Sequence, residues 1–485
     1  MKTTIRRDEI GAAPLFYCIH NNKMFHSSNI ESLLADSNVK PRLDAEGIAE
    51  LALLSPARNY AAGSAVLVGI KELPPGHQAE FDLETGKLTV TQYHKLQAFE
   101  HAESFEETSV TVRKMLTDSI VKLCVSNPCL FLSGGLDSSI IGAVMKEAGA
   151  DIVSFSVDYE GNDNNFKPGK FQPTQDAPFV AEMQRYLNSR HENIEFSTDE
   201  LFGSLSEATL ARGFPGMADV DGSMYLFCKK VSEACDCALS GEAADELFGG
   251  YRWYTEIGED LQTAKANETF FPWMQCVNAR ANLLNDGICK EINPIEYVQK
   301  ARADLIKNVP FLKSDDVVTR KRREMFYLNY YGFLQTLGER NHTMSRTHGL
   351  RVLAPFADAK IAEYAFNIPW EMKHFANREK GLLRHAFGAI LPHSVAWRKK
   401  SPFPKTHNPK YLSMVVRELD KIITASDCRI TEIYNKKKLT ELIESNGKSF
   451  GGENWFGQLM STPQIFAHLI QVETWLKKFD VFVKC

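Results

Sequence analysis

The sequence predicts an α/β fold built on a doubly wound parallel sheet. Two short apolar stretches, near residues 130 and 238, each run into a glycine-containing loop and then a helical pattern. From about residue 100 to residue 250, predicted strands alternate with predicted helices. This alternation is typical of a parallel sheet with helices on both faces. In such sheets ligands bind beyond the carboxyl ends of the strands, so we expect the two loops to carry function.

The first loop follows the apolar stretch Cys129–Leu132, which is typical of a buried strand. Ser133-Gly-Gly135 comes next, and Ser138-Ser139 open an apolar helix. The glycines let backbone N–H groups approach an oxyanion, and the helix N-terminus favours negative charge. Asp137 would repel a phosphate bound there unless a divalent cation lay between them, and Mg²⁺ is the usual choice. The loop therefore predicts a Mg²⁺–pyrophosphate site.

Two familiar phosphate loops are excluded at this place. No Gly-Lys-Ser/Thr follows the glycines, and no third glycine completes a dinucleotide fingerprint. The plain alternative is a Gly-Gly turn joining a strand to a helix. The whole run from Ser133 to Ser139 is far more specific than a glycine pair, which favours the anion site.

The second loop follows another short apolar strand, Cys237–Ser240, and extends from Gly241 to Tyr251. It would place Asp245 at the same rim of the sheet as Asp137, where both could hold Mg²⁺ on a triphosphate. The alternative is a helix N-terminus decorated with acids, which the helix dipole favours by itself. The presence of the first loop favours the metal interpretation.

The remaining elements are predicted from apolar spacing and turn residues. The loop between Tyr159 and Gln175 is rich in Gly, Asn, Asp and Pro and is expected to cover a nucleotide. After Tyr251 the pattern is mostly helical, and Gly447–Glu453 is expected to be a mobile loop. Predicted strands are Asp151–Asp158 and Asn193–Thr198, and predicted helices are Val110–Leu123, Ala177–Leu187 and Ser223–Glu233.

Residues 1–95 differ from the rest because short strand-like runs dominate them. Asp82–Gly86 is a hairpin-type turn, and Asp44–Leu54 reads as a helix with an apolar stripe. The strand-like runs are Leu15–Ile19, Val66–Ile70, His77–Phe81 and Lys87–Thr91.

Composition is that of a large globular protein. The chain has 485 residues, 44% apolar and 24% charged, with a net charge of −5. It therefore lacks the basic footprint of a nucleic-acid partner, and no apolar run is long enough to cross a membrane. Ten cysteines are scattered without CxxC pairing, so reduced thiols and a cytoplasmic location are expected.

The two loops resemble the synthetase domain of the asparagine synthetase family, within the pyrophosphatase-type ATP-binding (adenine nucleotide alpha hydrolase-like) superfamily. The resemblance is dense over about residues 100–410. It implies that residues 96–485 form an ATP-dependent amide ligase domain with a helical C-terminal part. Further matching segments are Met217–Asp221, Asn367–Lys373, Arg378–Arg384 and Ala396–Pro409.

The resemblance also implies a reaction. The side-chain carboxylate of aspartate attacks the α-phosphorus of ATP, pyrophosphate leaves, and an amine then attacks the acyl adenylate. ATP and Mg²⁺ are the implied cofactors, aspartate or a related acid and ammonia or another amine are the implied partners, and a homodimer is the implied assembly. The implied ATP-binding residues are Leu132, Ser133, Gly134, Gly135, Asp137, Ser138, Ser139, Val157, Ser240 and Gly241, and the implied metal ligands are Asp137 and Asp245.

Three further residues match catalytic positions of the family. Lys400 matches a lysine that neutralises charge developing on the α-phosphate, and Lys380 is a weaker case of the same kind. Glu242 matches a glutamate tied to intermediate formation and to deprotonation of the amine. The alternative for Lys400 is an exposed lysine in the basic run Arg398–Lys400.

Residues 1–95 resemble the later part of a glutamine amidotransferase domain, and we expect a partial remnant of it. The family nucleophile is an N-terminal cysteine, whereas position 2 here is Lys. Cys18 lies in an apolar run and is expected to be a packing residue. Glutaminase activity is therefore expected to be absent. A truncated gene and a true loss of the activity both remain open.

Three positions depart from the family pattern. Thr343 replaces a cation, Arg351 an acid and Leu353 an arginine, which predicts altered charge near the acyl substrate. Two other functions therefore stay open: a specialised natural-product or peptide amide ligase using another acid and amine, and a non-catalytic partner subunit of a full-length paralogue.

Overall fold

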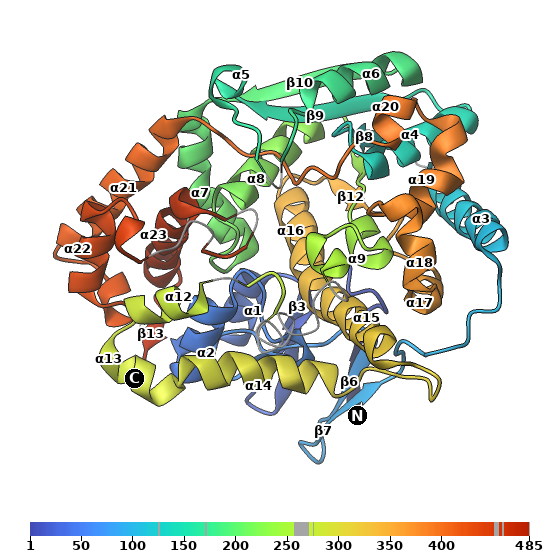
Figure 1. Cartoon of the computed structure of the whole chain (residues 1–485). Coiled ribbons are helices and arrows are strands. Elements are labelled where there is room, and N and C mark those ends of the chain that lie inside the picture. The colour runs from blue at the N-terminus through green and yellow to red at the C-terminus, as the bar shows by residue number, and fades with distance from the viewer. Residues whose placement is uncertain are drawn as a thin grey trace.

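The computed structural model describes residues 1–124, 127–169, 172–256, 271–274, 276–450, 455–457 and 460–484. Its centre is a five-stranded sheet in which every neighbouring pair is parallel, as the sequence predicts (Figure 1). The strands, in spatial order, are β10 (Arg190–Phe196), β9 (Val153–Tyr159), β8 (Cys129–Phe131), β11 (Cys237–Leu239) and β12 (Arg351–Leu353).

The winding of the sheet reverses between β8 and β11. Along the chain, β8, β9 and β10 are added outward on one side, and β11 and β12 then follow on the other side. Leu130 pairs with Leu239 across the reversal, so both predicted loops leave the same edge of the sheet side by side. A crevice outside such a switch point is the usual ligand site of this architecture.

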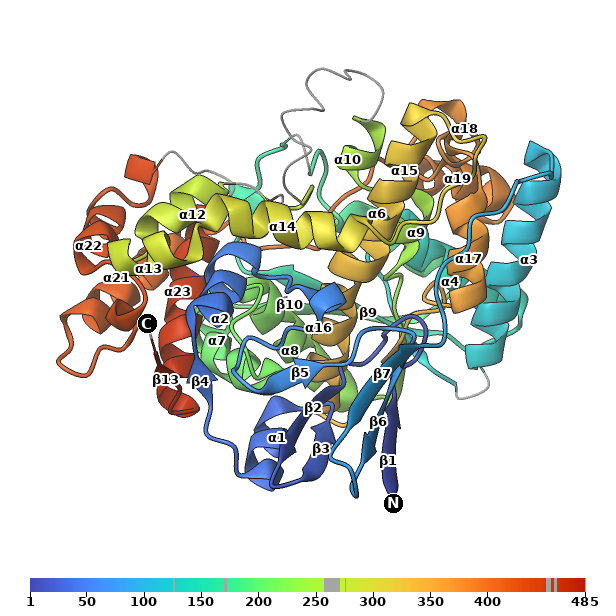
Figure 2. The ribbon, with the colours of Figure 1, turned by 90° about the horizontal axis from the view of Figure 1, so that it is seen from below.

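Helices surround this sheet. The group that contains α16 lies between the sheet and the N-terminal region (Figure 2). Helices α7, α8 and α16 contact one another, and α3, α4, α6 and α20 form a second connected group. The helices around the sheet are α3 (Phe105–Cys124), α4 (Leu136–Glu147), α5 (Asn162–Asn165), α6 (Ala177–Leu187), α7 (Thr198–Arg212), α8 (Asp219–Ser232), α9 (Ala244–Phe248), α16 (Leu334–Arg346), α19 (Gly381–Phe387) and α20 (His393–Ala396).

The chain after Tyr251 is mostly helical, as predicted, although β12 and a short C-terminal strand were not foreseen. Part of the predicted mobile loop Gly447–Glu453 lies outside the described residues. The remaining helices are α10 (Arg252–Thr255), α12 (Val277–Leu283), α13 (Asp286–Ile292), α14 (Pro294–Ile306), α15 (Val317–Leu328), α17 (Ala359–Asn367), α18 (Trp370–Lys373), α21 (Pro409–Thr424), α22 (Lys436–Glu444) and α23 (Thr462–Lys478).

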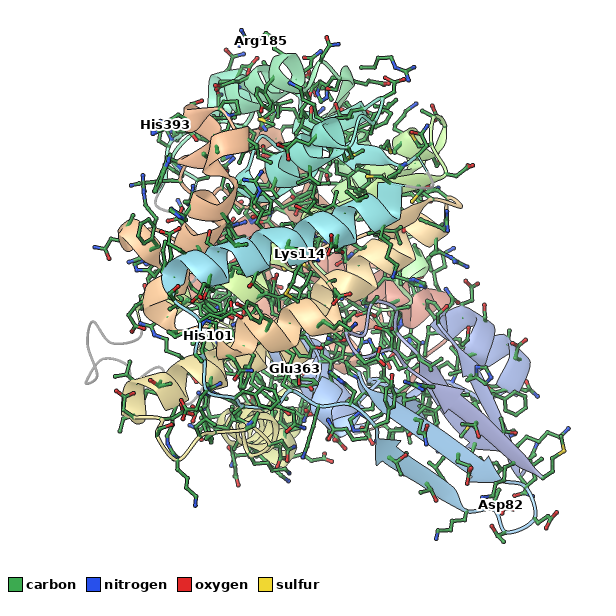
Figure 3. All side chains as sticks on the ribbon, turned by 90° about the vertical axis from the view of Figure 1, so that its right-hand side faces the viewer. Asp82, His101, Lys114, Arg185, Glu363 and His393 are labelled. Atoms are coloured by element: carbon green, nitrogen blue, oxygen red, sulfur yellow. The ribbon has the colours of Figure 1, made fainter. Side chains whose placement is uncertain are left out.

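The N-terminal region forms two small antiparallel sheets on the far side of α16 (Figure 2). The predicted hairpin is present, and Asp82 marks its tip away from the body of the protein (Figure 3). The strands are β1 (Lys2–Arg6), β6 (His77–Asp82) and β7 (Leu88–Gln92) in one sheet, and β3 (Lys23–Ser27), β2 (Phe16–His20) and β5 (Ile70–Glu72) in the other, with helices α1 (Ile30–Ser37) and α2 (Ala45–Ala49).

The two ends of the chain meet in this region. Strand β4 (Arg42–Leu43) pairs in parallel with β13 (Phe482–Val483). The main hydrophobic core runs from Ile10 of the N-terminal region to Val481, and Ile5, Tyr17, Leu73 and Ala79 form a second, small cluster within the N-terminal region. The sheet of β2, β3 and β5 therefore shares its core with the rest of the chain through Phe16, Cys18 and Ile70, whereas β7 is mostly exposed.

The predicted strand Val66–Ile70 is wrong. Strand β5 begins only at Ile70, and the residues before it form a turn. Val66 has a φ of 64°, which a β-branched residue adopts at a steric cost and which no strand permits. The apolar run reflects burial of Val66 and Leu67 in the core and not a strand.

A buried chain of charges joins the N-terminal region to α16. Glu72 accepts from Arg7 at 2.7 Å and from Arg58 at 2.5 Å, and Arg58 also donates to Glu339 of α16 at 2.9 Å. Arg212 of α7 donates to the other oxygen of Glu339 at 3.1 Å. Every side chain in this chain is at most 4% exposed. We call Arg7, Glu72, Arg58, Glu339 and Arg212 the interface ion network.

Glu50 gives this part of the fold an unusual pH dependence. It lies in a π-helix (Glu50–Leu54) that follows α2, and its carboxyl accepts from Tyr297 of α14 at 2.6 Å. Burial raises the pKa of Glu50 to about 7 from an ordinary 4.5. Between pH 4.5 and about 7, Glu50 is therefore protonated in the folded protein and ionised in the unfolded chain. This contribution to stability is present below pH 4.5 and is lost as the pH rises to about 7.

Replacing Glu50 with glutamine should remove this dependence. We expect the unfolding free energy of the wild type to fall relative to E50Q by up to about 1.4 kcal/mol per pH unit from pH 5 to about 7. Urea titrations across this range measure the difference. Glu31, an exposed residue of α1 that is not among the charges acting on Glu50, supplies the control E31Q, whose slope should match the wild type. Parallel slopes for E50Q and the wild type would contradict the prediction.

All described cysteines are free thiols, as the scattered spacing predicts. Among the described helices, none has the length and apolar character needed to cross a membrane.

Candidate active site

A cavity of about 210 Å³ opens at the carboxyl ends of β8, β9 and β11, at the reversal of the sheet. Residues 398–404, which precede α21, form its opposite wall. Gly134, Ser139 and Lys380 are the predicted site residues that do not line it. The predicted residues that do line it are Leu132, Ser133, Gly135, Asp137, Ser138, Val157, Ser240, Gly241, Glu242, Asp245 and Lys400.

The first loop leads from β8 into α4, and close packing fixes its shape. Gly134 has a φ of 65°, and a Cβ there would lie 2.6 Å from the backbone nitrogen of Val180 in α6. Gly135 caps α4 without a side-chain hydrogen bond, so no capping side chain occupies the first-turn amides of this helix, and Gly135, Asp137 and Ser138 line the cavity. The Ser133 and Ser138 hydroxyls lie 3.1 Å apart across the loop. Gly134 and the buried Ser139 thus support the loop from behind.

The two predicted metal ligands, Asp137 and Asp245, both accept hydrogen bonds from the same lysine. Lys380, at the start of α19, donates to both oxygens of Asp137 at 2.8 and 2.6 Å and to Asp245 at 2.6 Å. Lys400 binds the other oxygen of Asp245 at 2.6 Å. Lys400 is therefore part of the site, and its alternative as a solvated lysine is wrong. We call Asp137, Asp245, Lys380 and Lys400 the carboxylate–lysine cluster.

Burial and charge act in opposite directions in this cluster. Burial raises the pKa of Asp137, although Lys380 opposes the shift. Burial also disfavours the charge on Asp245, but Lys380 and Lys400 outweigh it and lower the pKa of that carboxyl. The pKa of Lys400 is raised because attraction to Asp245 exceeds the effect of its own burial. At neutral pH the cluster therefore holds Asp245 and Lys400 charged.

Glu242 stands beside the cluster and is held by an arginine. It follows Gly241, whose Cβ position would lie 2.9 Å from the Cβ of Asp137. Arg340 of α16 donates to its carboxylate at 2.6 Å. The side chain of Glu242 is 22% exposed, while that of Arg340 is 2% exposed. Glu242 is thus fixed at the cavity wall with its carboxylate within reach of a bound molecule.

Arg398 is a site residue whose role sequence reasoning missed. Its Nη1 donates to the Gly134 carbonyl at 3.1 Å, and its Nη2 binds the carboxylate of Asp176. The phosphate-type loop and the start of α6 are thereby clamped to the segment that carries Lys400. Arg398 belongs to a basic run with Lys399 and Lys400, and nothing in the sequence of this run indicates that Arg398 is buried.

The loop expected to cover a nucleotide does border the cavity. Asn162, Phe166 and Gln172 from it line the wall, and Asn162 accepts from the backbone of His407 at 2.9 Å. Residues 170 and 171 of this loop lie outside the described part of the chain. The loop is therefore tied to the same 398–407 segment that carries Lys400.

The three departures from the family pattern lie elsewhere than expected. Thr343 is buried and donates to the Glu339 carbonyl within α16, so it does not reach the cavity. Arg351 and Leu353 line a second cavity of about 640 Å³, next to Ile10–Ala13, and this cavity shares Glu242 with the first. The altered charges therefore lie behind Glu242, away from the carboxylate–lysine cluster.

Cys18 has the packing role that the sequence predicts. It lies in β2, is 3% exposed, and burial raises the pKa of its thiol. A buried thiol with a raised pKa is a poor nucleophile.

Taken together, the parallel sheet, the glycine loop at a helix N-terminus and the carboxylate pair are typical of nucleotide-binding α/β proteins. Residues 111–477 match the "Asparagine synthase" family, and residues 1–94 match the "Glutamine amidotransferase domain". The chain belongs to the asparagine synthase family.

Curated relatives agree with this placement. The chain is 39% identical to asparagine synthetase [glutamine-hydrolyzing] 3 of Bacillus subtilis, over 98% of this chain and 76% of that protein. It is 26% identical to asparagine synthetase [glutamine-hydrolyzing] 1 of the same organism, over 82% of this chain and 65% of the relative. It is 24% identical to asparagine synthetase B [glutamine-hydrolyzing] of Escherichia coli, over 69% of this chain and 53% of the relative.

Proposed function

We propose that this protein is an ATP-dependent amide ligase that converts the side-chain carboxylate of aspartate into an acyl adenylate and then amidates it with ammonia. The observation that carries the proposal is the carboxylate–lysine cluster beside a glycine loop at the reversal of the sheet. We further propose a division into an amidotransferase-like region, residues 1–95, and a ligase domain, residues 96–485. The expected homodimer stays a prediction that light scattering tests.

In this proposal the nucleotide lies across the strand ends. Its pyrophosphate contacts the loop at Ser133 and Gly135 and the first turn of α4, while Gly134 shapes the loop from behind. Leu132 and Val157, at the ends of β8 and β9, border the adenosine. Ser240 and Gly241, at the end of β11, also border the nucleotide.

The carboxylate pair fits Mg²⁺ in its ligand chemistry. Mg²⁺ is usually held by one or two carboxylates together with substrate phosphates. Asp137 and Asp245 already converge on a single cation, the ammonium of Lys380, with separations of 2.6 to 2.8 Å. Among the described residues, no group of three or more His, Cys, Asp or Glu side chains is placed to hold a metal ion. Mg²⁺ at Asp137 and Asp245 would therefore need phosphate oxygens of the nucleotide as further ligands. Bound there, Mg²⁺ would neutralise phosphate charge.

The chain's own residues supply the remaining chemistry. An oxygen of the acid attacks the α-phosphorus, and the bond from that phosphorus to the pyrophosphate oxygen breaks. Lys400 stabilises the negative charge that grows on the α-phosphate. The amine nitrogen then attacks the acyl carbon, Glu242 accepts a proton from that nitrogen, and AMP leaves with the electron pair of the broken C–O bond.

The nitrogen source in this proposal is ammonia. Residues 1–94 contain one cysteine, Cys18, and it is buried with a raised pKa. No thiol in this region is thus suited to glutamine hydrolysis.

A substitution at Gly134 should weaken ATP binding. An alanine there brings Cβ within 2.6 Å of the Val180 nitrogen, so the loop must shift. We expect the ATP affinity of G134A to fall about tenfold or more, by isothermal titration. Gly149 offers a matched control, because its φ of 76° is also positive but a Cβ there meets nothing within 4 Å. G149A should lose stability and keep its ATP affinity. Equal affinities for both variants would contradict the proposed loop contact.

The proposed activity is tested by product analysis. The protein is incubated with ATP, Mg²⁺ and L-aspartate, with ammonium chloride or with glutamine, and pyrophosphate and asparagine are measured. We expect both products with ammonium and background levels with glutamine. Pyrophosphate without asparagine would place the error in the amine. Silence with both nitrogen sources would overturn aspartate as the acid.

A further inference from the structure

We propose that Arg340 forms a carboxylate subsite that binds the second acid group of the substrate, the one that is not activated. The inference rests on the proposed function and names the feature by which the site would select an amino-dicarboxylic acid. It starts from the placement of Arg340 on α16. Phe333, Leu337 and Arg340, spaced i, i+4 and i+7, all line the cavity. Figure 1 shows α16 in the middle of the fold, between α8 and α9.

The other face of α16 is anchored, so Arg340 projects from a fixed support. Gln335 donates to the Ile10 carbonyl at 3.0 Å and accepts from Arg7 at 3.2 Å. One turn later, Glu339 is held by Arg58 and Arg212. Arg340 follows directly and points to the cavity. A rigid support of this kind is what a recognition residue requires.

The hydrogen bonds of Arg340 set it apart from the other buried arginines nearby. Arg58, Arg212 and Arg398 each use both Nη nitrogens, mostly on carboxylates or backbone carbonyls. Arg340 uses only Nη2, on Glu242, and within the described part of the chain its Nη1 has no hydrogen-bond partner. The Nε atoms of all four also lack partners, so Nη1 makes the difference.

A buried guanidinium nitrogen without a partner is unfavourable, and a carboxylate is the partner its geometry suits best. Nη1 and Nη2 lie side by side at the end of the guanidinium, where the two oxygens of one carboxylate can bind. Glu242 fills only the position at Nη2. Phe403 lies over the guanidinium at 5.2 Å from its ring centre. This ring belongs to the same segment as Lys400 and lines the cavity beside Arg340.

The position of Arg340 relative to the reacting groups fits a short diacid. Arg340 contacts Glu242, Glu242 follows Gly241, and Gly241 lies against Asp137 of the carboxylate–lysine cluster. A molecule whose first carboxylate meets the α-phosphate at this cluster can therefore present a second one toward Arg340. Phe333, Leu337 and Phe403 supply an apolar wall between the two ends.

The test compares two enzymes and two acids. L-Aspartate carries the second carboxylate, and β-alanine is the same molecule without it. We expect wild-type kcat/KM for pyrophosphate release to favour aspartate by about 100-fold or more, since a lost contact to a buried charge has such an effect. R340M should lose about 100-fold more with aspartate than with β-alanine, because only the loss common to both acids passes through Glu242, while the KM for ATP stays unchanged. R340K, which keeps the charge and loses the fork, should lie between them.

Each alternative result has a definite meaning. Equal losses with both acids would show that Arg340 acts only through Glu242, and the subsite would be overturned. A wild type that fails to discriminate between the acids would also overturn it, even if R340M does not fold. A wild type inactive with aspartate, but active with another diacid, would refute aspartate as the substrate and not the subsite. R340M must then lose about 100-fold more with that diacid than with the same acid lacking its second carboxylate, and equal losses would overturn the subsite.

Discussion

Replacing Lys400 with methionine should reduce the rate of pyrophosphate release by about 10²- to 10³-fold, the loss typical when one preorganised stabiliser of transition-state charge is removed. In the proposed mechanism Lys400 is the cation that follows charge onto the α-phosphate, because its ammonium contacts one carboxylate oxygen, of Asp245, at 2.6 Å. Lys380 is bound to three carboxylate oxygens and is less free to move. Methionine keeps the length of the side chain and removes the charge.

The reduction should appear in kcat more than in ATP affinity. An interaction that forms fully only in the transition state lowers kcat and kcat/KM together. Lys399 provides the matched control, since it is the adjacent lysine and is exposed. K399M should keep wild-type rates. If K400M retained more than about a third of the wild-type rate, the role assigned to Lys400 would be wrong.

The second large effect concerns stability. Replacing Glu339 with alanine should lower the unfolding free energy by about 3–5 kcal/mol, because two buried guanidinium groups lose their shared partner. Arg58 and Arg212 meet on Glu339 at 2.9 and 3.1 Å, and all three side chains are at most 4% exposed. Tyr60 also donates to this carboxylate at 3.2 Å.

Urea unfolding measures this loss. The control is the exposed pair of Lys2 and Glu80, whose nitrogen and oxygen lie 2.7 Å apart. E80A removes a carboxylate from the same region and should change stability by less than about 1 kcal/mol. A loss of similar size for E339A and E80A would show that the interface ion network does not hold the N-terminal region to α16.

The parts of the site that are contiguous in sequence were predictable. The run from Ser133 to Ser139 contains its own strand end, turn and helix start, so local rules determine its shape. The meeting of Asp137 and Asp245 followed from strand topology, since parallel strands bring their carboxyl ends to one edge. Their common contact with Lys380 was not predictable, because that lysine is held in a left-handed conformation 243 residues from Asp137.

Interactions between distant buried charges were missed altogether. Arg7, Arg58 and Glu72 look like ordinary surface residues in the sequence, because charged side chains are rarely buried. Only tertiary packing shows that each has an opposite charge on another element. Arg340 and Arg398 were hidden for the same reason. Val66 shows the opposite case. Its apolar run predicts a strand, but these residues are apolar because they are buried in a turn.

Transfer of isotope from the acid to AMP would test the central claim most directly. L-Aspartate with ¹⁸O in its side-chain carboxylate is converted with ammonium, ATP and Mg²⁺, and the phosphate products are analysed by mass spectrometry. Attack on the α-phosphorus predicts a labelled oxygen in AMP and none in pyrophosphate. Label in inorganic phosphate, with ADP as the nucleotide product, would show activation at the γ-phosphate and would contradict the assignment of this cavity.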